Sequence, residues 1–205
     1  MKPVQALKAP GEVRIIGGQW KRSRLPVPAR PGLRPTPDRV RETLFNWLGQ
    51  NLTGLRCIDA FAGSGALGFE AASRGAAEVR LLELDPGLAA SLRSNAQRLK
   101  AENIRVQQGD ALAQLRAAPL GVWDVIFLDP PFGDGGNDAL FLSALQLCVP
   151  LLAPQGSIYL EAPRPWQAEE LHALGLQCFR QGKAGMVHYH LLEAQPAEQG
   201  DNRAP

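Results

Sequence analysis

The sequence lacks any apolar run near the ~20 residues that a membrane-spanning helix requires, which excludes a helical membrane protein. Residues 1–6 also lack the apolar core of a secretion signal, so we expect a cytoplasmic protein with no membrane partner. The chain has 205 residues, of which 45% are hydrophobic and 20% are charged. These values are ordinary for a globular protein and predict a single α/β domain.

Cysteine and histidine are scarce. The three cysteines, Cys57, Cys148 and Cys178, are widely spaced, which argues against a disulfide framework and against a zinc site. Each has apolar neighbours in the sequence, so we expect three buried free thiols. His188 and His190 share one face of a predicted strand, but no further ligands accompany them. We therefore expect no metal site and interpret both histidines as solvated.

The net charge of +2 hides an uneven distribution. Residues 1–42 contain ten Lys or Arg and three acidic residues, whereas the rest of the chain contains 12 basic and 17 acidic residues. A basic segment attached to an acidic body favours contact with a polyanion, although a solvated, mobile arm has the same composition. The candidate contacts are Arg14, Lys21, Arg22, Arg24, Arg34 and Arg41.

Strand and helix patterns alternate from residue 56 onward, which predicts a parallel sheet with helices on both faces. The predicted strands are 56–61, 78–83, 103–108, 122–128 and 155–161. The predicted helices are 65–74, 86–101, 110–117 and 138–150. Two further strands, 175–180 and 186–193, are separated by residues 181–185 and predict a hairpin that adds an antiparallel last strand.

The N-terminal part has a different pattern. Residues 13–18 and 24–27 are predicted to be short strands, and a helix is predicted from residue 37 or 38 to residue 48. We divide the chain into a flexible N-terminus (1–12), a basic extension with its helix (13–50), a main domain (51–194) and a disordered tail (195–205).

The segment Asp129-Pro130-Pro131-Phe132 follows the apolar run 125–128, which has the pattern of a buried strand. Because proline donates no N–H, the strand must end there. The carboxylate and a freed carbonyl can then accept the two hydrogens of a planar amino group, and the aromatic ring can stack on the base that carries it. An ordinary strand exit with a capping Asp is the structural alternative.

A glycine loop follows the first predicted strand of the main domain. Gly63, Gly65 and Gly68 satisfy G-x-G-x-x-G, and Glu83 lies twenty residues after Gly63. The pattern is typical of nucleotide-binding loops and permits a nicotinamide-dinucleotide site in which Glu83 holds a ribose. Asp59, just before the glycines, would repel a pyrophosphate but suits the cationic end of S-adenosylmethionine.

Two more acidic residues follow the next strands. Glu83 can accept hydrogen bonds from both ribose hydroxyls, and Asp110 can accept one from an adenine amino group. Asp110 can equally serve as a helix N-cap, and both roles can coexist. Because the carboxyl ends of parallel strands face one crevice, we expect these acids to line it together.

With this loop, these acids and Asp-Pro-Pro-Phe in order, the chain resembles the class I S-adenosylmethionine-dependent methyltransferases that modify exocyclic amines. Residues 14–21 and 32–46 narrow the resemblance to the RsmD family, over residues 13–192. That family methylates N2 of a guanine in small-subunit 16S ribosomal RNA. The resemblance implies a Rossmann-like, mostly parallel seven-stranded sheet with an antiparallel last strand and a small N-terminal β/helix extension.

The resemblance also assigns residues. It implies that Asp129, Pro130, Pro131 and Phe132 are catalytic and lie at the target base. The implied contacts to S-adenosylmethionine are Asp59, Phe61, Gly63, Ser64, Gly65, Glu83, Asp110, Ala111, Thr36 and Arg39. The implied partner is 16S ribosomal RNA or the assembling 30S subunit, bound by a monomer.

Other functions remain open from the residues alone. A nicotinamide-dependent oxidoreductase fits the glycines but leaves Asp-Pro-Pro-Phe unexplained. An amino-methyltransferase that acts on DNA or on a protein glutamine would use a similar tetrapeptide. A non-catalytic RNA-binding module would have no use for a complete cofactor crevice.

Overall fold

The computed structural model describes residues 11–132 and 137–195. The expected flexible N-terminus and the tail fall almost entirely outside these residues. However, Gly11 and Glu12, which the prediction placed in the flexible segment 1–12, belong to strand β1.

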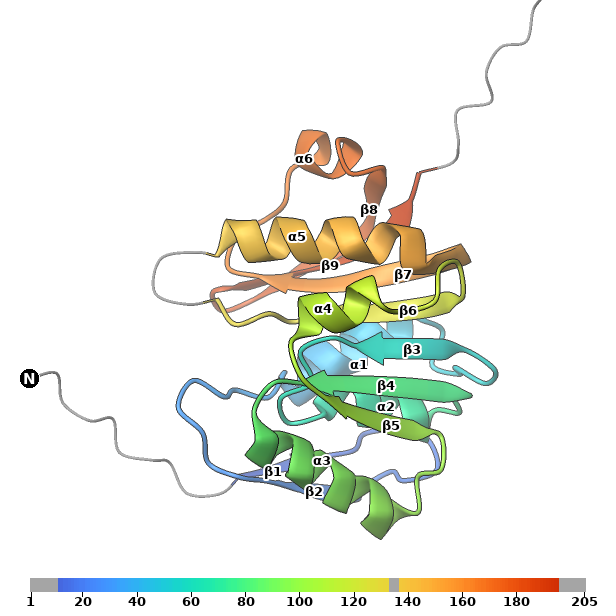
Figure 1. Cartoon of the computed structure of the whole chain (residues 1–205), viewed down its shortest axis with the longest axis vertical. Helices are drawn as coiled ribbons and strands as arrows, with labels where there is room; N and C mark the ends of the chain where they lie inside the picture. Colours follow the sequence, from blue (N-terminus) through green and yellow to red (C-terminus); the bar gives the residue numbers. More distant parts are fainter. Residues whose placement is uncertain (1–10, 133–136, 196–205) are drawn as a thin grey trace, which may run out of the picture.

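The core of the structure is a seven-stranded sheet with the order β5-β4-β3-β6-β7-β9-β8 (Figure 1). Neighbouring strands are parallel from β5 to β7, whereas β9 pairs antiparallel with both β7 and β8. This confirms the predicted Rossmann-like α/β fold with its antiparallel last strand. The strands are β3 (Arg56–Asp59), β4 (Glu78–Glu83), β5 (Ile104–Gln108), β6 (Trp123–Leu128), β7 (Leu152–Ala162), β8 (Leu176–Ala184) and β9 (Val187–Ala194).

Helices cover both faces of the sheet because successive strand residues point to opposite sides. One hydrophobic cluster joins α1, α2 and α3 to one face, and another joins α4, α5 and α6 to the other. All eight residues of α2 are buried. The helices are α1 (Asp38–Trp47), α2 (Ala66–Ser73), α3 (Pro86–Leu99), α4 (Ala111–Arg116), α5 (Asp138–Cys148) and α6 (Ala168–His172), with a 3-10 turn η1 (Val149–Leu151).

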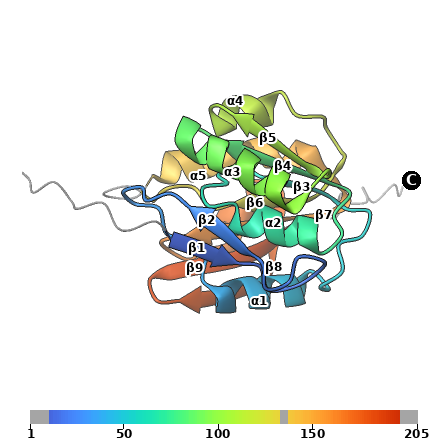
Figure 2. The same cartoon turned by 90° about the horizontal axis from the view of Figure 1, so that it is seen from below.

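The N-terminal residues form a two-stranded hairpin, β1 (Gly11–Arg14) and β2 (Arg24–Val27), outside the main sheet. Figure 2 shows the hairpin beside α2 and α3, on the side of the sheet that α1 covers. Val13, Ile15 and Leu25 are buried in the same cluster as α1 and α2. The first strand is therefore shorter than the predicted 13–18, because residues 15–23 form the connecting turn.

The C-terminal hairpin differs from its prediction. β8 continues to Ala184, so the loop is only Gly185-Met186 and not residues 181–185. A Cβ on Gly182 would overlap the ring of Tyr189 on the paired strand, so the glycine lets the aromatic ring lie across β8. Helix α6, of five residues, was not predicted at all.

Two predictions about single residues are wrong. His190 is 1% exposed, because β9 lies between β7 and β8 and buries the residue, and burial lowers the pKa of His190. Cys178 is exposed on the edge strand β8, whereas Cys57 and Cys148 are buried free thiols as expected. Within residues 11–132 and 137–195, no helix is long and apolar enough to cross a membrane.

Candidate active site

The glycine loop joins β3 to α2 at the carboxyl edge of the sheet. Gly65 precedes α2 with φ +78°, a left-handed conformation that favours glycine. A Cβ there would lie 2.6 Å from Leu92. Gly68 packs so closely on the sheet that a Cβ would overlap Leu81. The glycines therefore bring the start of α2 against β3 and β4, where Ser64 is also buried.

Glu83 ends β4 and fixes the glycine loop. Its carboxylate accepts a hydrogen bond of 2.7 Å from the backbone N–H of Gly63 and another of 2.7 Å from that of Asp85. Leu33, from the N-terminal extension, lies over Gly63, where a Cβ would stand 3.0 Å from the Leu33 side chain. The loop is thus held by hydrogen bonds to Glu83 and covered by Leu33 of the N-terminal extension.

Asp59 is the last residue of β3 and is only 2% exposed. It accepts a hydrogen bond of 3.0 Å from the backbone N–H of Gly68. Burial is the main reason that the pKa of Asp59 rises to about 7, and the nearby Glu83 and Glu161 carboxylates raise it further. A cation placed here would be stabilised by ionisation of Asp59.

Asp129 comes directly after β6. Phe127 pairs with Asp59 on β3 on one side and with Tyr159 on β7 on the other, so Asp129 continues the row on the face that α1 and α2 cover. Burial, followed by the negative charges of Glu161 and Asp59, raises the pKa of Asp129 well above its usual range. Asp59, Asp129 and Glu161 form a group of three carboxyls, called here the acid cluster.

Glu161 is the member of the acid cluster that sequence reasoning missed. It lies on β7, one position beyond the Leu128–Leu160 register pair, and is 4% exposed. Its carboxylate accepts a 3.0 Å hydrogen bond from the hydroxyl of Tyr159, and Thr36 also hydrogen-bonds to it. Burial raises its pKa. The available signal was an acid at the carboxyl end of the apolar run 158–162, on the strand next to Asp129.

The remaining residues of the Asp-Pro-Pro-Phe segment lie at the tip of β6. Pro130 is buried, Pro131 is exposed and Phe132 is half-buried. The Phe132 ring packs 6.1 Å, centroid to centroid, from that of Phe141 on α5. The segment therefore spans the edge of the sheet, with Asp129 on the α1 side and Phe132 toward α5.

The predicted cofactor residues occupy the same edge. Thr36 is buried against Glu161, and Arg39 is exposed on the first turn of α1. Asp110 caps α4 by accepting a 2.8 Å hydrogen bond from the N–H of Ala113, so the N-cap interpretation is confirmed. Ala111 begins α4 and is buried, and Phe61 is half-buried before the glycines.

Arg41 is not available to RNA, which corrects its prediction as a substrate contact. It is 1% exposed, because it faces the core between α1 and α2 rather than solvent. Its guanidinium donates to Glu70 at 3.2 Å and to Asp38 at 2.6 Å. It also donates to the backbone carbonyls of Thr36 and Arg14. The residue therefore fastens the hairpin and the start of α1 to α2.

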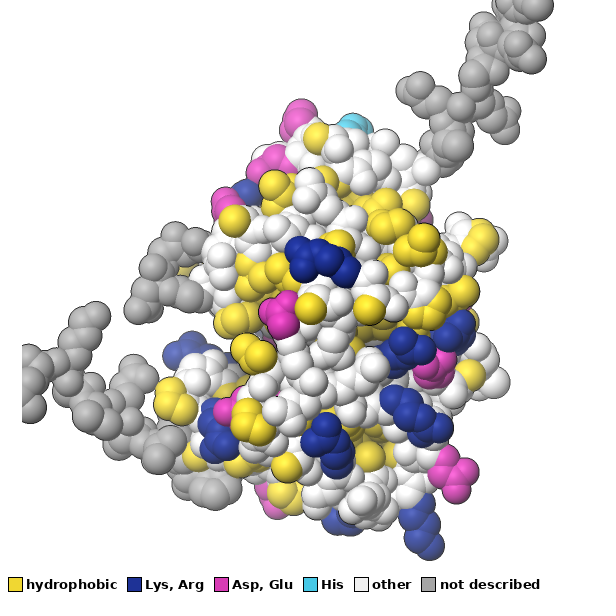
Figure 3. Space-filling model, in the orientation of Figure 1, with side chains coloured by type: hydrophobic (Ala, Val, Ile, Leu, Met, Phe, Trp, Pro, Cys, Tyr) yellow, Lys and Arg dark blue, Asp and Glu magenta, His cyan; other side chains and the backbone are white. Residues whose placement is uncertain are grey.

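The other predicted RNA contacts are exposed: Arg14, Lys21, Arg22, Arg24 and Arg34. Arg14 forms an ion pair of 2.8 Å with Asp38, and Arg24 forms one of 2.8 Å with Glu12. In the space-filling view, Lys and Arg side chains are scattered over the middle and lower parts of the face that carries α3 and α4, with some acidic side chains among them (Figure 3). Among the described residues, no group of three or more His, Cys, Asp or Glu has a metal-binding arrangement.

Comparison with known proteins identifies the family. Residues 13–193 match the family described as "Conserved hypothetical protein 95". Over 204 residues the chain is 41% identical to the ribosomal RNA small subunit methyltransferase D of Escherichia coli, covering 93% of this chain and 94% of the relative. The chain belongs to the RsmD family of methyltransferases. A relative of the same name from Haemophilus influenzae is 52% identical over 137 residues, covering 64% of this chain and 70% of the relative.

Solved structures agree with this assignment to the RsmD family. A putative methyltransferase from Escherichia coli has a TM-score of 0.77 and 38% identity, and covers 90% of this chain and 99% of its own. A putative methylase from Haemophilus influenzae has a TM-score of 0.73 and 37% identity, covering 91% and 100%. A precorrin methyltransferase from Geobacter metallireducens, at 17% identity and a TM-score of 0.64, shares the fold alone.

Proposed function

We propose that the chain transfers a methyl group from S-adenosylmethionine to the exocyclic N2 amine of a guanine in small-subunit 16S ribosomal RNA. The proposal is carried by the acid cluster beside the glycine loop, in which Asp129 opens the Asp-Pro-Pro-Phe segment. The cluster suits both a cationic donor and a base that presents an amine. The names of the relatives, ribosomal RNA small subunit methyltransferase D, favour ribosomal RNA over DNA.

The residues at the carboxyl edge fit S-adenosylmethionine. The carboxyls of the acid cluster ionise more readily when a cation lies beside them, so the cluster favours the sulfonium and the amino group of the cofactor. Glu83 uses its carboxylate for two backbone N–H groups and retains lone pairs for ribose hydroxyls. Asp110 and Ala111, where α4 begins, would lie at the adenine. When bound, the cofactor supplies an activated methyl group on a positively charged sulfur.

Asp129 and Pro130 position the amine. The lone pair of the guanine N2 is delocalised into the ring, so the amine is a weak nucleophile. The Asp129 carboxylate and the Pro130 carbonyl each accept one N–H, which favours a pyramidal nitrogen whose lone pair points away from both acceptors. Phe132 holds the base by stacking, a contact worth ~1–3 kcal/mol. The main contribution of these residues is orientation.

The acid cluster can also accept the proton that the amine releases. The amine loses one proton when its nitrogen forms the new bond to carbon, and the Asp129 carboxylate is placed to accept it. Burial, followed by the charges of Glu161 and Asp59, raises the pKa of Asp129, which makes its carboxylate a stronger base than an exposed Asp. Thr36 and Tyr159 hold Glu161 in place for this role.

The basic residues of the extension would hold the RNA backbone. Lys21, Arg22 and Arg34 are exposed cations of this extension. A base inside a helix could not reach Asp129, so the target guanine must be flipped out or unpaired. Each phosphate contact should add ~0.7–0.9 to the slope of log affinity against log salt.

The test is transfer of tritiated methyl groups from S-adenosylmethionine to unmodified 16S ribosomal RNA, free and within 30S subunits, followed by nucleoside analysis. We expect the label in N2-methylguanosine. Label in methylated adenine or cytosine would indicate a different amino-methyltransferase, and absence of label with both substrates would overturn the proposal.

A further inference from the structure

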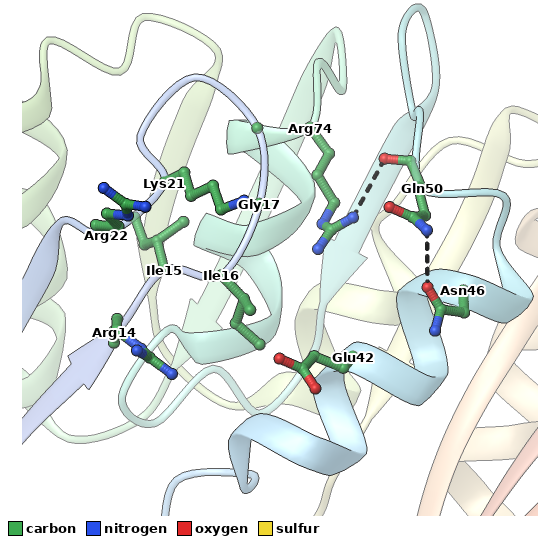
Figure 4. A pocket seen from close by; sticks show the side chains of 11 residues that line it. Arg14, Ile15, Ile16, Gly17, Lys21, Arg22, Glu42, Asn46, Gln50 and Arg74 are labelled. Carbon is green, nitrogen blue, oxygen red and sulfur yellow. Dashed lines mark hydrogen bonds between the residues drawn. The ribbon is translucent and has the colours of Figure 1, made fainter.

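A second cavity lies away from the acid cluster, between the β1–β2 turn and α1 (Figure 4). Its volume is about 570 Å³, within the usual range for a small-molecule site. One wall is the turn, with Lys21 and Arg22, and the other is the side of α1. The cavity is called the α1 groove below.

The α1 wall carries three polar side chains in a row. Glu42 and Asn46 are four residues apart on α1, and Gln50 follows four residues later, just after the helix, so all three line the same side. The Gln50 amide donates a 2.9 Å hydrogen bond to Asn46 Oδ1. This bond leaves the Gln50 oxygen free to accept and the Asn46 nitrogen free to donate, a pairing that matches the edge of an unpaired base.

The opposite wall is cationic. Lys21 and Arg22 are exposed, and neither pairs with an acid in the described part of the chain. Glu42 on the other wall would repel an anion. The two walls therefore favour one orientation of a bound nucleotide, with its phosphate toward the turn and its base toward α1.

The floor of the groove is built by close packing. Arg74, at the end of α2, is 8% exposed and donates to Glu70 and to the backbone carbonyl of Gln50. A Cβ on Gly17 would overlap the Arg74 guanidinium, and one on Gly18, where φ is +72°, would overlap the backbone of α2. The two glycines thus allow the turn to rest on α2 and bring a fixed positive charge to the bottom of the groove.

The α1 groove is separated from the acid cluster by the length of α2, whose first residue follows the glycine loop and whose last residue, Ser73, contacts the β1–β2 turn. Thr36, which contacts Glu161, lies just before α1, and Arg14 at the near end of the groove pairs with Asp38 in the first turn of α1. From Glu42 to Asn46 the helical part of the wall rises about 6 Å, and Gln50 lies beyond the end of α1 at Trp47. An RNA strand whose target base reaches Asp129 would therefore meet this wall with a nucleotide further along the strand.

We propose, on the basis of the proposed function, that the α1 groove binds an unpaired nucleotide of the substrate RNA further along the strand from the target guanine. Its phosphate lies against Lys21 and Arg22, and its base lies against Asn46 and Gln50. The groove would thus select RNA that has a single-stranded segment at this distance from the target, in addition to holding the backbone.

The test measures binding of a fluorescein-labelled single-stranded RNA to the full chain by anisotropy, at several salt concentrations and without cofactor. In one double variant, Lys21→Ala with Arg22→Asn, we expect about tenfold weaker binding and a salt slope that falls by roughly 0.7 for each lost phosphate contact. Asn replaces Arg22 because this residue has φ +73°, which Asn tolerates.

A second double variant, Asn46→Ala with Gln50→Gly, should also bind about tenfold more weakly, but with an unchanged salt slope, because no charge is lost. Gly replaces Gln50 because this residue has φ +62°. A merely structural role would not separate the two slopes. The matched controls are Arg116→Ala on α4 and Gln97→Ala on α3, both exposed and outside the groove. Both should bind as the wild type does. Thermal unfolding of every variant shows whether it is folded.

Wild-type affinity in both double variants would overturn the α1 groove proposal, and so would an equal loss with a duplex probe. These outcomes are separate from a failure of the proposed function. If the wild type binds the RNA but forms no N2-methylguanosine, the methylation proposal fails, while the variants still decide whether the groove holds RNA.

Discussion

Glu70 and Glu161 are both buried carboxylates, at 0% and 4% exposure, but their surroundings are opposite. Glu70 accepts four hydrogen bonds, two from backbone N–H groups of the β1–β2 turn and two from arginines. Glu161 has two hydroxyl partners, Tyr159 and Thr36, and its charged neighbours are the carboxyls of Asp59 and Asp129. One acid is fully compensated within the chain, and the other is not.

The comparison distinguishes a buried carboxylate that stabilises the fold, Glu70, from one that lies in a candidate ligand site, Glu161. A buried charge is costly unless it is paired, and around Glu70 the chain provides that pairing itself. In the acid cluster burial raises the pKa values of Asp59, Asp129 and Glu161, and neighbouring carboxyls raise those of Asp59 and Asp129 further. Such a group is stabilised when a cation or an N–H donor arrives, which is typical of a functional site.

The largest effect is expected for Asp129→Ala, which removes a carboxyl from the acid cluster. We expect methyl transfer to fall by roughly 10²- to 10⁴-fold, because the amine loses its acceptor and its base, while cofactor binding remains. Single-turnover kinetics and calorimetric titration of the cofactor measure the two effects. Asp138→Ala, which removes an exposed acid at the start of α5, is the control and should be near wild type. Near-normal turnover of Asp129→Ala would remove this residue from the mechanism.

At the paired carboxylate Glu70, Arg41→Ala should mainly affect the stability of the fold. It leaves Glu70 buried with one arginine fewer, and we expect the free energy of unfolding to fall by ~3–5 kcal/mol. Urea denaturation measures the change. Arg39→Ala, two residues earlier and exposed, should change stability by less than about 0.5 kcal/mol. Equal effects of the two substitutions would show that the buried ion pair does not hold the hairpin to α2.

Phe132→Ala tests whether the target base stacks on Phe132 beside the acid cluster. Loss of base stacking should raise the KM for RNA roughly 5- to 100-fold, corresponding to ~1–3 kcal/mol, and leave kcat at saturating RNA less changed. Phe179→Ala removes an aromatic ring that is 54% exposed on β8 and serves as the control. An unchanged rate of Phe132→Ala at subsaturating RNA would contradict the stacking role.

The smallest expected effect is the pH dependence that Asp59 causes. Its pKa is about 7 in the folded chain and lower in the unfolded chain, so the folded state holds the proton more tightly. The free protein should therefore lose stability as pH rises from about 4 to about 7. A cationic ligand favours the ionised form, so its affinity should fall as pH drops below about 7, by up to about tenfold per pH unit.

Calorimetric titration of S-adenosylmethionine between about pH 5.5 and 7.5 measures this dependence. Asp59→Asn keeps an oxygen for the Gly68 N–H but cannot ionise, so its binding should be weaker and nearly independent of pH in that range. The same pH dependence in wild type and Asp59→Asn would assign the titration to another group.

Sequence reasoning predicted most elements of the main sheet because apolar periodicity and glycine breaks are local signals. The predicted strand 78–83 coincides with β4, and the N-cap role allowed for Asp110 is confirmed. Sequence reasoning failed where the environment of a side chain is formed by a segment that is distant in the sequence. Arg41 was interpreted as a surface cation, but α2 places Glu70 opposite it. Glu161 was overlooked because its neighbour Asp129 lies on another strand.

The sequence by itself determined the alternation of strands and helices, the glycine loop and the rigid Asp-Pro-Pro-Phe exit, since each depends on the torsions and hydrogen bonds of consecutive residues. Only the tertiary structure decided which charges are neutralised and which are left uncompensated. Electrostatic energy depends on distance in space and on burial, and both are fixed when α1, α2 and the parallel strands pack together.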